Sequence, residues 1–367
     1  MTTKRIPVVL VTGFLGSGKT TMLNHLLRGS ADTRIGVIVN DFGSINIDAM
    51  AVAGQVDSMI PIENGCLCCA ADSAEMDAML ARLTEPSLGI DVIVVEASGL
   101  AEPQSMIRTL LSSENEHVLY GGLVEVVDAA EFENTRERHP EIDRHVRAAD
   151  AVVLNKADRV PEPELTRLLE ALARIAPGTP VVTAEHGRVD PGFLFDRGAG
   201  APGEERFRQL SFADVCTDEH GDHGEHEWGE HLHAAYESVE FVADRPLDPR
   251  RFMAFLDSRP AGLYRMKGFL HFAAPGHDEK FALHAVGSYL RFQPSAWAGG
   301  EARTTQLVMI GAGIDAEALT KELTGCVAAG PDAVGDHHMM GVLRYVRDRD
   351  EDRDEDRDED RDEDRDE

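Results

Sequence analysis

One glycine-rich stretch of the chain carries the residue types of a phosphate-binding loop. Residues 13–20 read Gly-Phe-Leu-Gly-Ser-Gly-Lys-Thr, which is the pattern G-x-x-x-x-G-K-T. In such a loop, backbone N–H groups close around phosphate oxygens, Lys19 would reach the β- and γ-phosphates, and the Thr20 hydroxyl would bind Mg²⁺. The residues predicted to contact the nucleotide phosphates are Gly13, Gly16, Ser17, Gly18, Lys19, Thr20 and Thr21.

The segments on either side have the patterns that position this loop. Residues 6–12 (IPVVLVT) form an apolar run typical of a buried strand, and residues 21–27 (TMLNHLL) have the spacing of a helix. The chain contains only six lysines, so a lysine at this position is unlikely to arise by chance. The strand–loop–helix context therefore favours a phosphate site over a chance glycine-rich turn.

A second functional carboxylate is predicted at the end of another apolar run. Residues 91–97 (DVIVVEA) read as a buried strand that ends on Glu96, where P-loop proteins hold Mg²⁺ or a water bound to it. We assign Lys19, Thr20 and Glu96 as catalytic, with Thr20 and Glu96 as metal ligands. A carboxylate that caps the next helix is the alternative for Glu96. Asp41, after the apolar residues 34–40, is a weaker candidate for the Mg²⁺ shell, and an ordinary turn carboxylate explains it equally well.

Residues 155–158 indicate which base is bound. They read Asn-Lys-Ala-Asp and follow the apolar residues 151–154. The Asp158 carboxylate can accept hydrogen bonds from the ring N–H and the exocyclic amine of guanine, an edge that adenine lacks. Asn155 can serve the ring acceptors, and the Lys156 stem can cover the purine face. The set predicts GTP over ATP, because a site built for hydrogen bonds discriminates strongly against a ligand without them. Residues 183–184 are a candidate for a last backbone contact to the base.

Three of the five cysteines lie close together, in the run Cys-Leu-Cys-Cys at residues 66–69. Clustered thiols in a chain of this size indicate metal or redox chemistry more often than a disulfide framework. They follow a short apolar run, residues 59–62, and precede a helical pattern, residues 74–83. We therefore predict that Cys66, Cys68 and Cys69 bind Zn²⁺ on a strand-to-helix loop near the phosphate face. The alternative is that the three cysteines are small buried side chains that pack a turn.

A histidine-rich acidic segment follows the first domain. Residues 198–235 shift to Gly, Pro and charge, and residues 216–233 combine histidines with six carboxylates. Such a composition suits loose capture of Zn²⁺ or another transition metal ion, and a solvated loop without function is the alternative. The candidate ligands are His220, His223, His226, His231 and His233.

Composition narrows the class of protein. The formal net charge is −30, which argues against nucleic acid or an anionic membrane as the main partner. Residues 348–367 are five copies of Asp-Arg-Asp-Glu and contribute −10 of that charge. No run approaches the roughly 18 apolar residues of a membrane helix, and residues 1–12 lack the pattern of a signal peptide. We therefore expect a cytoplasmic protein.

The predicted fold class is α/β, in two domains. Residues 1–197 alternate strands and helices as a P-loop domain with a mostly parallel sheet does. Residues 236–327 predict a smaller α+β domain with a mostly antiparallel sheet. Its strands are expected at 237–242, 262–272, 281–292 and 305–310, and its helices at 249–257 and 315–324, the second with Asp315 as N-cap. Residues 328–367 are expected to be a disordered tail with the acidic repeat.

Taken together, these motifs resemble the CobW family of metal-handling P-loop GTPases. The resemblance rests on residues 13–20, on Glu-Asn-Gly-Cys-Leu-Cys-Cys at 63–69, on Glu96 with Gly99, and on residues 155–158. It extends through the histidine-rich linker to Arg-Met-Lys-Gly at 265–268 and Thr-Gln-Leu-Val-Met-Ile-Gly at 305–311. It implies a GTPase that hydrolyses GTP to GDP and phosphate and delivers zinc, or cobalt or another transition metal ion, to a client metalloprotein.

Other functions remain open at this point. A zinc-responsive regulatory GTPase that acts on a large assembly such as the ribosome is the main alternative, and a zinc buffer built on the histidine tract is another. A small-molecule kinase is disfavoured by residues 155–158. We count a second copy of the chain, as a homodimer, among the partners that the sequence leaves open.

Overall fold

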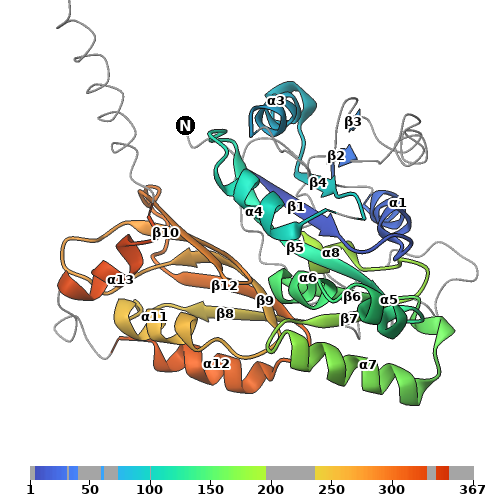
Figure 1. Ribbon diagram of the computed structural model, residues 1–367. Coiled ribbons are helices and arrows are strands. Elements are labelled where there is room, and N and C mark those ends of the chain that lie inside the picture. The colour runs from blue at the N-terminus through green and yellow to red at the C-terminus, as the bar shows by residue number, and fades with distance from the viewer. Residues whose placement is uncertain are drawn as a thin grey trace, which may run out of the picture. The chain divides into compact units, whose positions relative to one another are not determined.

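The computed structural model describes residues 5–30, 33–39, 59–61, 73–99, 101–195, 236–328 and 336–346. The chain divides into two compact units, residues 1–237 and 238–367. Each unit has its own sheet, and we describe each by itself (Figure 1). Within the described ranges, every helix is too short or too polar to traverse a lipid bilayer.

The first unit is built on a seven-stranded sheet with the order β3-β2-β4-β1-β5-β6-β7. All of its neighbouring strands pair in parallel, as predicted. The strands are short apolar runs because a parallel sheet is covered on both faces. They are β1 (Ile6–Thr12), β2 (Ile35–Val39), β3 (Met59–Pro61), β4 (Val92–Glu96), β5 (Val118–Asp128), β6 (Ala151–Asn155) and β7 (Val181–Ala184).

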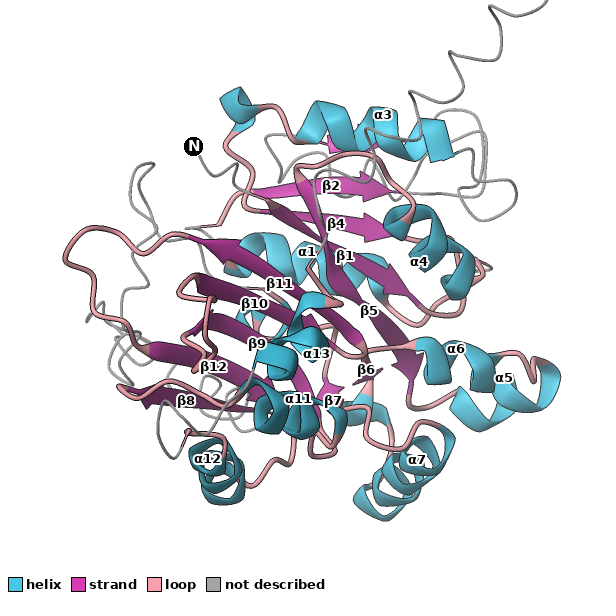
Figure 2. Ribbon diagram, turned by 90° about the vertical axis from the view of Figure 1, so that its left-hand side faces the viewer, coloured by secondary structure: helices cyan, strands magenta, loops and turns pink. Residues whose placement is uncertain are grey.

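Helices follow the strands and cover both faces of this sheet. α1 and α4 lie on opposite faces, as both views show (Figures 1 and 2). The helices are α1 (Lys19–Gly29), α3 (Ser73–Leu83), α4 (Pro103–Leu111), α5 (Phe132–Arg138), α6 (Ile142–Ala148), α7 (Glu162–Ile175) and α8 (Pro191–Leu194), with the short 3₁₀ turns η1 (Pro86–Leu88) and η2 (Ala157–Arg159). The expected P-loop domain with a parallel sheet is therefore confirmed.

The second unit is a five-stranded sheet with helices on one face, in the order β11-β10-β9-β12-β8. Figure 2 shows α11 and α13 in front of it. Its elements are β8 (Glu237–Ala243), α11 (Pro249–Asp257), β9 (Leu263–Leu270), β10 (Lys280–Val286), β11 (Tyr289–Ser295), β12 (Thr305–Gly311), α12 (Ala316–Gly325), η4 (Asp336–Met339) and α13 (Met340–Leu343). The Asp315 carboxylate caps α12 by accepting a hydrogen bond from the Ala318 N–H, as predicted.

Two details of the second unit differ from the sequence prediction. The apolar stretch 281–292 is not one strand but the hairpin β10–β11, because Gly287 adopts φ 52° and reverses the chain between Val286 and Tyr289. The predicted disordered tail also starts too early. Residues 336–343 form η4 and α13, and the fully buried side chains of Met339 and Val342 join the hydrophobic core of this unit.

Candidate nucleotide site

Four neighbouring strands of the first sheet bring the predicted site residues to one edge. In the order β4-β1-β5-β6, these strands end at Glu96, Thr12, Asp128 and Asn155. Because the strands are parallel, their carboxyl ends share an edge, which is where open α/β sheets bind ligands. The glycine-rich loop leaves β1 at the same edge and leads directly into α1.

The loop needs glycine at three positions. Gly13, Gly16 and Gly18 have φ values of 143°, 78° and 101°, a region that residues with a side chain rarely adopt. A Cβ atom on Gly13 would lie 2.3 Å from the carbonyl oxygen of Val126, and one on Gly18 would lie 2.3 Å from Nδ2 of Asn155. The loop therefore keeps its tight path against β5 and β6 only with these glycines.

Lys19 is positioned above the loop by the loop's own backbone. Its Nζ atom donates to the carbonyl oxygens of Gly13, at 2.8 Å, and Phe14, at 3.3 Å. The side chain is buried, and it begins α1, whose first turn carries no acidic residue. A helix N-terminus attracts anions through its unpaired N–H groups. The lysine and the helix end together present positive charge to a phosphate at this edge.

Thr20 and Glu96 lie side by side although they are 76 positions apart in the sequence. The Thr20 hydroxyl donates to Oε1 of Glu96 at 2.7 Å, and the Glu96 side chain is buried at the end of β4. A hydroxyl and a carboxylate are oxygen ligands of the kind that Mg²⁺ prefers. The two residues therefore fit the predicted metal pair, and the interpretation of Glu96 as a cap of the following helix is not supported, since that helix has Glu102 as N-cap.

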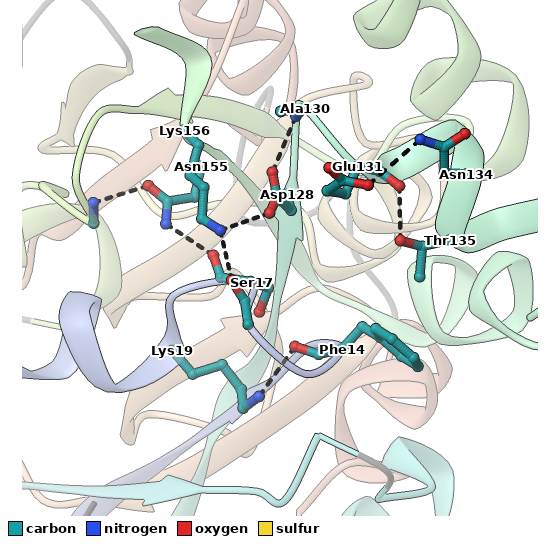
Figure 3. Close-up of polar contacts among 12 residues, drawn as sticks. Phe14, Ser17, Lys19, Asp128, Ala130, Glu131, Asn134, Thr135, Asn155 and Lys156 are labelled. Carbon is teal, nitrogen blue, oxygen red and sulfur yellow. Dashed lines mark hydrogen bonds and ion pairs between the residues drawn. The ribbon is translucent and has the colours of Figure 1, made fainter. Parts of the chain in front are cut away.

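Asn155 connects the glycine-rich loop to the segment that follows β7. Its Nδ2 donates to the carbonyl oxygen of Ser17 at 2.9 Å, and its Oδ1 accepts from the Gly187 N–H at 2.8 Å (Figure 3). The amide is buried. Both ends of the amide contact protein backbone, and a contact of Asn155 with the acceptors of a purine ring stays a prediction. Its role in the structure is to hold two loops together.

Lys156 makes a second connection beside the first. Its Nζ donates to the carbonyl oxygen of Gly16 at 2.7 Å and to Oδ2 of Asp128 at 2.6 Å (Figure 3). Its backbone is left-handed, with φ 61°, at the turn that follows β6. Asp128, which the sequence analysis did not single out, thus fixes the lysine stem close to the glycine-rich loop.

Asp158 lies in η2, directly after this turn. Its side chain is 27% exposed, and Oδ2 is 3.8 Å from Nε2 of His186. His186 and Gly187 both have positive φ and follow β7, which ends at Ala184. The carboxylate predicted to read the base follows β6, and the segment predicted to contact it, residues 183–184, ends the neighbouring strand β7 at the same sheet edge.

One buried carboxylate near the loop escaped the sequence analysis. Glu125 pairs with Thr12 across β5 and β1, is 2% exposed, and accepts a hydrogen bond from the Thr12 hydroxyl at 2.6 Å. Burial raises its pKa to about 7, although the Thr12 hydrogen bond and the Lys19 charge oppose the rise. The signal in the sequence is a single Glu inside the apolar strand 118–128.

Several predicted ligands lie outside the described residues. They are Asp41, Cys66, Cys68, Cys69, His220, His223, His226, His231 and His233. Among the residues that the structure does describe, there is no cluster of three or more His, Cys, Asp or Glu side chains arranged to hold a metal ion.

Comparison with known proteins decides the family. Residues 7–183 match the model for the CobW/HypB/UreG nucleotide-binding domain, and residues 236–327 match that for the cobalamin synthesis protein cobW C-terminal domain. The chain is 30% identical to the zinc chaperone CobW of Sinorhizobium sp over 84% of its own length and 93% of that protein. The chain belongs to the CobW family. It is therefore a P-loop GTPase, with a nucleotide-binding domain followed by the family's C-terminal domain.

Further relatives of this CobW family member agree. The zinc chaperone YjiA of Escherichia coli K12 is 35% identical over 52% of this chain and 61% of its own length. The zinc-regulated GTPase metalloprotein activator 1 of Saccharomyces cerevisiae is 32% identical over 47% of this chain and 46% of its own length. The resemblance read from the sequence motifs is confirmed, and proteins named zinc chaperone and zinc-regulated GTPase metalloprotein activator are among those that this chain is similar to.

Proposed function

We propose that this protein binds Zn²⁺ at Cys66-x-Cys68-Cys69 and uses GTP hydrolysis to transfer the ion to a client metalloprotein. The observation that supports the proposal is the register of the first sheet. Pro61, Val39 and Glu96 occupy one row across β3, β2 and β4, so β3 ends at the edge that carries Glu96. Two strand spacings separate β3 from β4, or about 10 Å.

The cysteines follow that row within a short length of chain. Cys66 is five residues after Pro61, and five residues reach at most about 17 Å. The thiols can therefore reach the edge of the sheet where Thr20 and Glu96 lie. A structural role of the cysteines far from the nucleotide would be harder to reconcile with this short connection.

The residues of the nucleotide site have separate roles in GTP hydrolysis. Lys19 and the N–H groups of residues 13–21 stabilise the negative charge that develops on the transferred phosphoryl group, so catalysis is mainly positioning and electrostatics. Thr20 and Glu96 would hold Mg²⁺, which neutralises phosphate charge when it is bound. Asp158 selects guanine, while Asn155 and Lys156 hold the loop in place for the phosphates.

Coupling of GTP hydrolysis to Zn²⁺ transfer requires the GTP-bound and GDP-bound states to differ in their affinity for the ion. The thiolates of Cys66, Cys68 and Cys69 supply soft ligands suited to zinc, with a further ligand from elsewhere. GTP would favour the arrangement that binds the ion, and GDP the arrangement that releases it. A ligand can shift such an equilibrium only by its difference in affinity for the two states.

Zinc titration in the two nucleotide states tests the proposal. The full chain is loaded with a non-hydrolysable GTP analogue or with GDP, and Zn²⁺ affinity is measured by competition with a chromophoric chelator. We expect tighter binding with the analogue, and loss of that difference when Cys66, Cys68 and Cys69 are changed to Ser. Cys326→Ser is the matched control, because this thiol is buried in the second unit.

Equal Zn²⁺ affinity in the two nucleotide states would refute the coupling. If the triple Ser variant kept the difference in Zn²⁺ affinity, the metal site would not be at these cysteines. Deletion of residues 220–233 separates a chaperone from a buffer. A chaperone keeps the nucleotide-dependent site after the deletion, whereas a buffer loses most of its binding stoichiometry. Capture of bound proteins from zinc-poor cells then distinguishes a client apo-metalloprotein from a large assembly.

A further inference from the structure

Two residues other than glycine have a positive φ in the described part of the chain, and both lie next to Asp158. Lys156, with φ 61°, precedes Asp158 by two residues. His186, with φ 53°, follows β7, and its Nε2 is 3.8 Å from Oδ2 of Asp158. A side chain makes this backbone conformation unfavourable, so residues that keep it are concentrated at functional sites. The conformation of His186 therefore points to a role at the base-binding end of the nucleotide site.

The backbone around His186 is held in a fixed position. The Gly187 N–H donates to Oδ1 of Asn155 at 2.8 Å, and a Cβ atom on Gly187 would lie 2.7 Å from the backbone nitrogen of Met22 on α1. The His25 imidazole, also on α1, forms a hydrogen bond with the His186 backbone. These contacts fix the point from which the His186 imidazole extends, next to Asp158.

The side chains of His186 and Asp158 differ in their freedom to move. The imidazole is 70% exposed, whereas the carboxylate is 27% exposed and therefore partly enclosed by its neighbours. Exposed side chains change rotamer within nanoseconds. When a ligand approaches Asp158, the imidazole is thus the group that can move aside, while the carboxylate stays in place.

The imidazole of His186 and a guanine base require the same carboxylate. Guanine offers a ring N–H and an exocyclic amine, and the two donors together need both oxygens of Asp158. A protonated imidazole at 3.8 Å lies within ion-pair distance of one of these oxygens, Oδ2. Histidine side chains change charge between about pH 5 and 8, so this ion pair exists only in the lower part of that range.

The segments next to His186 contain further charged groups. They are His25 and Arg28 on α1, Lys156 and Arg159 at η2, and Glu185 and Arg188 in the turn itself. The His25 imidazole also titrates. Burial lowers its pKa, and the charges of Arg188 and Arg28 lower it further. His25 must therefore be tested separately from His186.

We propose that His186 is a specificity-determining residue, whose protonated imidazole competes with guanine for the Asp158 carboxylate. This inference rests on the proposed role of Asp158 in base recognition and adds the group that controls it. The protonated imidazole pairs with the carboxylate and weakens guanine binding, whereas the neutral imidazole leaves both oxygens to the base. The preference for guanine over adenine therefore increases as the pH rises.

The affinities of the full chain for GDP and ADP test the proposal. Both are measured between about pH 5.5 and about pH 8 by displacement of a GDP analogue with a fluorescent group on its ribose. The diphosphate groups of GDP and ADP titrate alike, so the ratio of the two dissociation constants reports the base alone. We expect the preference for GDP to increase by about three-fold over this range, as suits an exposed ion pair.

Variants of two residues assign the pH dependence. His186→Asn is neutral at every pH, and Asn tolerates a positive φ, so its GDP preference should stay at the high-pH value of the wild type. His186→Lys keeps a positive charge and should stay at the low-pH value. His25→Gln can still donate to the His186 backbone and should follow the wild-type profile. Tripolyphosphate binding confirms that each variant keeps a folded phosphate site.

A matched control is His117→Asn, at an exposed position that directly precedes β5 and lies at the opposite end of that strand from Asp128. It should also follow the wild-type profile. Asp158→Asn tests the base recognition on which the inference rests, and a low preference for GDP at every pH would support both. An undiminished preference in Asp158→Asn would refute base recognition by Asp158, and the present proposal with it.

Three other results would overturn the role of His186 alone. A GDP preference of the wild type that does not change with pH would show that the imidazole does not compete. A preference that decreases as the pH rises would show that the protonated imidazole supports guanine binding. A pH dependence that persists in His186→Asn, or disappears in His25→Gln, would assign the effect to another group.

Discussion

The buried carboxyl of Glu125 makes the stability of the first unit depend on pH near neutrality. The side chain lies beside Thr12, the residue before the glycine-rich loop, and is 2% exposed. An unperturbed Glu carboxyl has a pKa of 4.5, and burial raises that of Glu125 to about 7. The folded protein therefore keeps a proton that the unfolded chain has already lost over this range of pH.

The direction of the effect follows from proton linkage. The free energy of unfolding falls with rising pH wherever the folded state binds more protons than the unfolded state. The contribution of Glu125 is fully present below about pH 4.5, declines up to about pH 7, and is lost above that value. A difference of this size between the two pKa values corresponds to about 3 kcal/mol.

Glu125→Gln should remove this dependence, because the neutral amide has the shape of the protonated carboxyl. In urea denaturation of the nucleotide-free protein, we expect the first unit of the variant to match the wild type near about pH 4.5. Near about pH 8 it should be more stable by up to about 3 kcal/mol. Hydrogen exchange in β1 assigns the transition to the first unit. Glu170→Gln, at an exposed position of α7, is the control and should change nothing. Parallel pH profiles of the wild type and Glu125→Gln would refute the reasoning.

The remaining predictions concern the site and the C-terminal helices. Asn155→Ala should weaken binding of inorganic tripolyphosphate as well as GTP, each by about ten-fold, because the lost hydrogen bonds hold the phosphate loop; unchanged tripolyphosphate affinity in isothermal titration would contradict this. Gly18→Ala should weaken GTP binding by about ten-fold or more, since its Cβ would lie 2.3 Å from Asn155. Asp158→Asn should lower GTP affinity by about a hundred-fold or more and raise that for xanthosine triphosphate, whose C2 carbonyl can accept from the amide. Met339→Ala should destabilise the second unit by about 2–5 kcal/mol in thermal unfolding, whereas Met340→Ala, at a side chain that is 66% exposed, should have little effect.

Local patterns were sufficient to predict the glycine-rich loop and the strands that position it. The loop 13–20 needs positive φ at closely spaced positions, and glycine adopts positive φ without steric strain. The spacing of the glycines in the sequence therefore predicts the loop. The strands of the first unit are also readable, because a parallel sheet covered on both faces demands continuous apolar runs. The pairing of Thr20 with Glu96 then follows from the shared edge of neighbouring parallel strands.

Features that depend on distant packing were missed. Residues 336–346 contain apolar residues between histidines and an acidic tail, and their burial becomes evident only when the core that receives Met339 and Val342 is known. The β10–β11 turn was overlooked because apolar residues flank a single Gly-Ser pair. Asp128 was missed for another reason. In the sequence it is an ordinary carboxylate at the end of a strand, and only the structure shows that Lys156 donates a hydrogen bond to it.

The contacts of residues 155–156 connect base recognition to phosphate binding through the planarity of the peptide bond. In a trans peptide, the C=O of one residue and the N–H of the next lie in one plane and point in opposite directions, and none of the described peptide bonds is cis. Asn155 holds the Ser17 carbonyl, so the Gly18 N–H points away from Asn155. Lys156 holds the Gly16 carbonyl, while the next amide, the Ser17 N–H, donates to the Phe14 carbonyl oxygen within the loop at 3.1 Å. The turn that precedes Asp158 thus orients the Gly18 N–H, so a change at Asn155 in the base half of the nucleotide site should also alter phosphate binding.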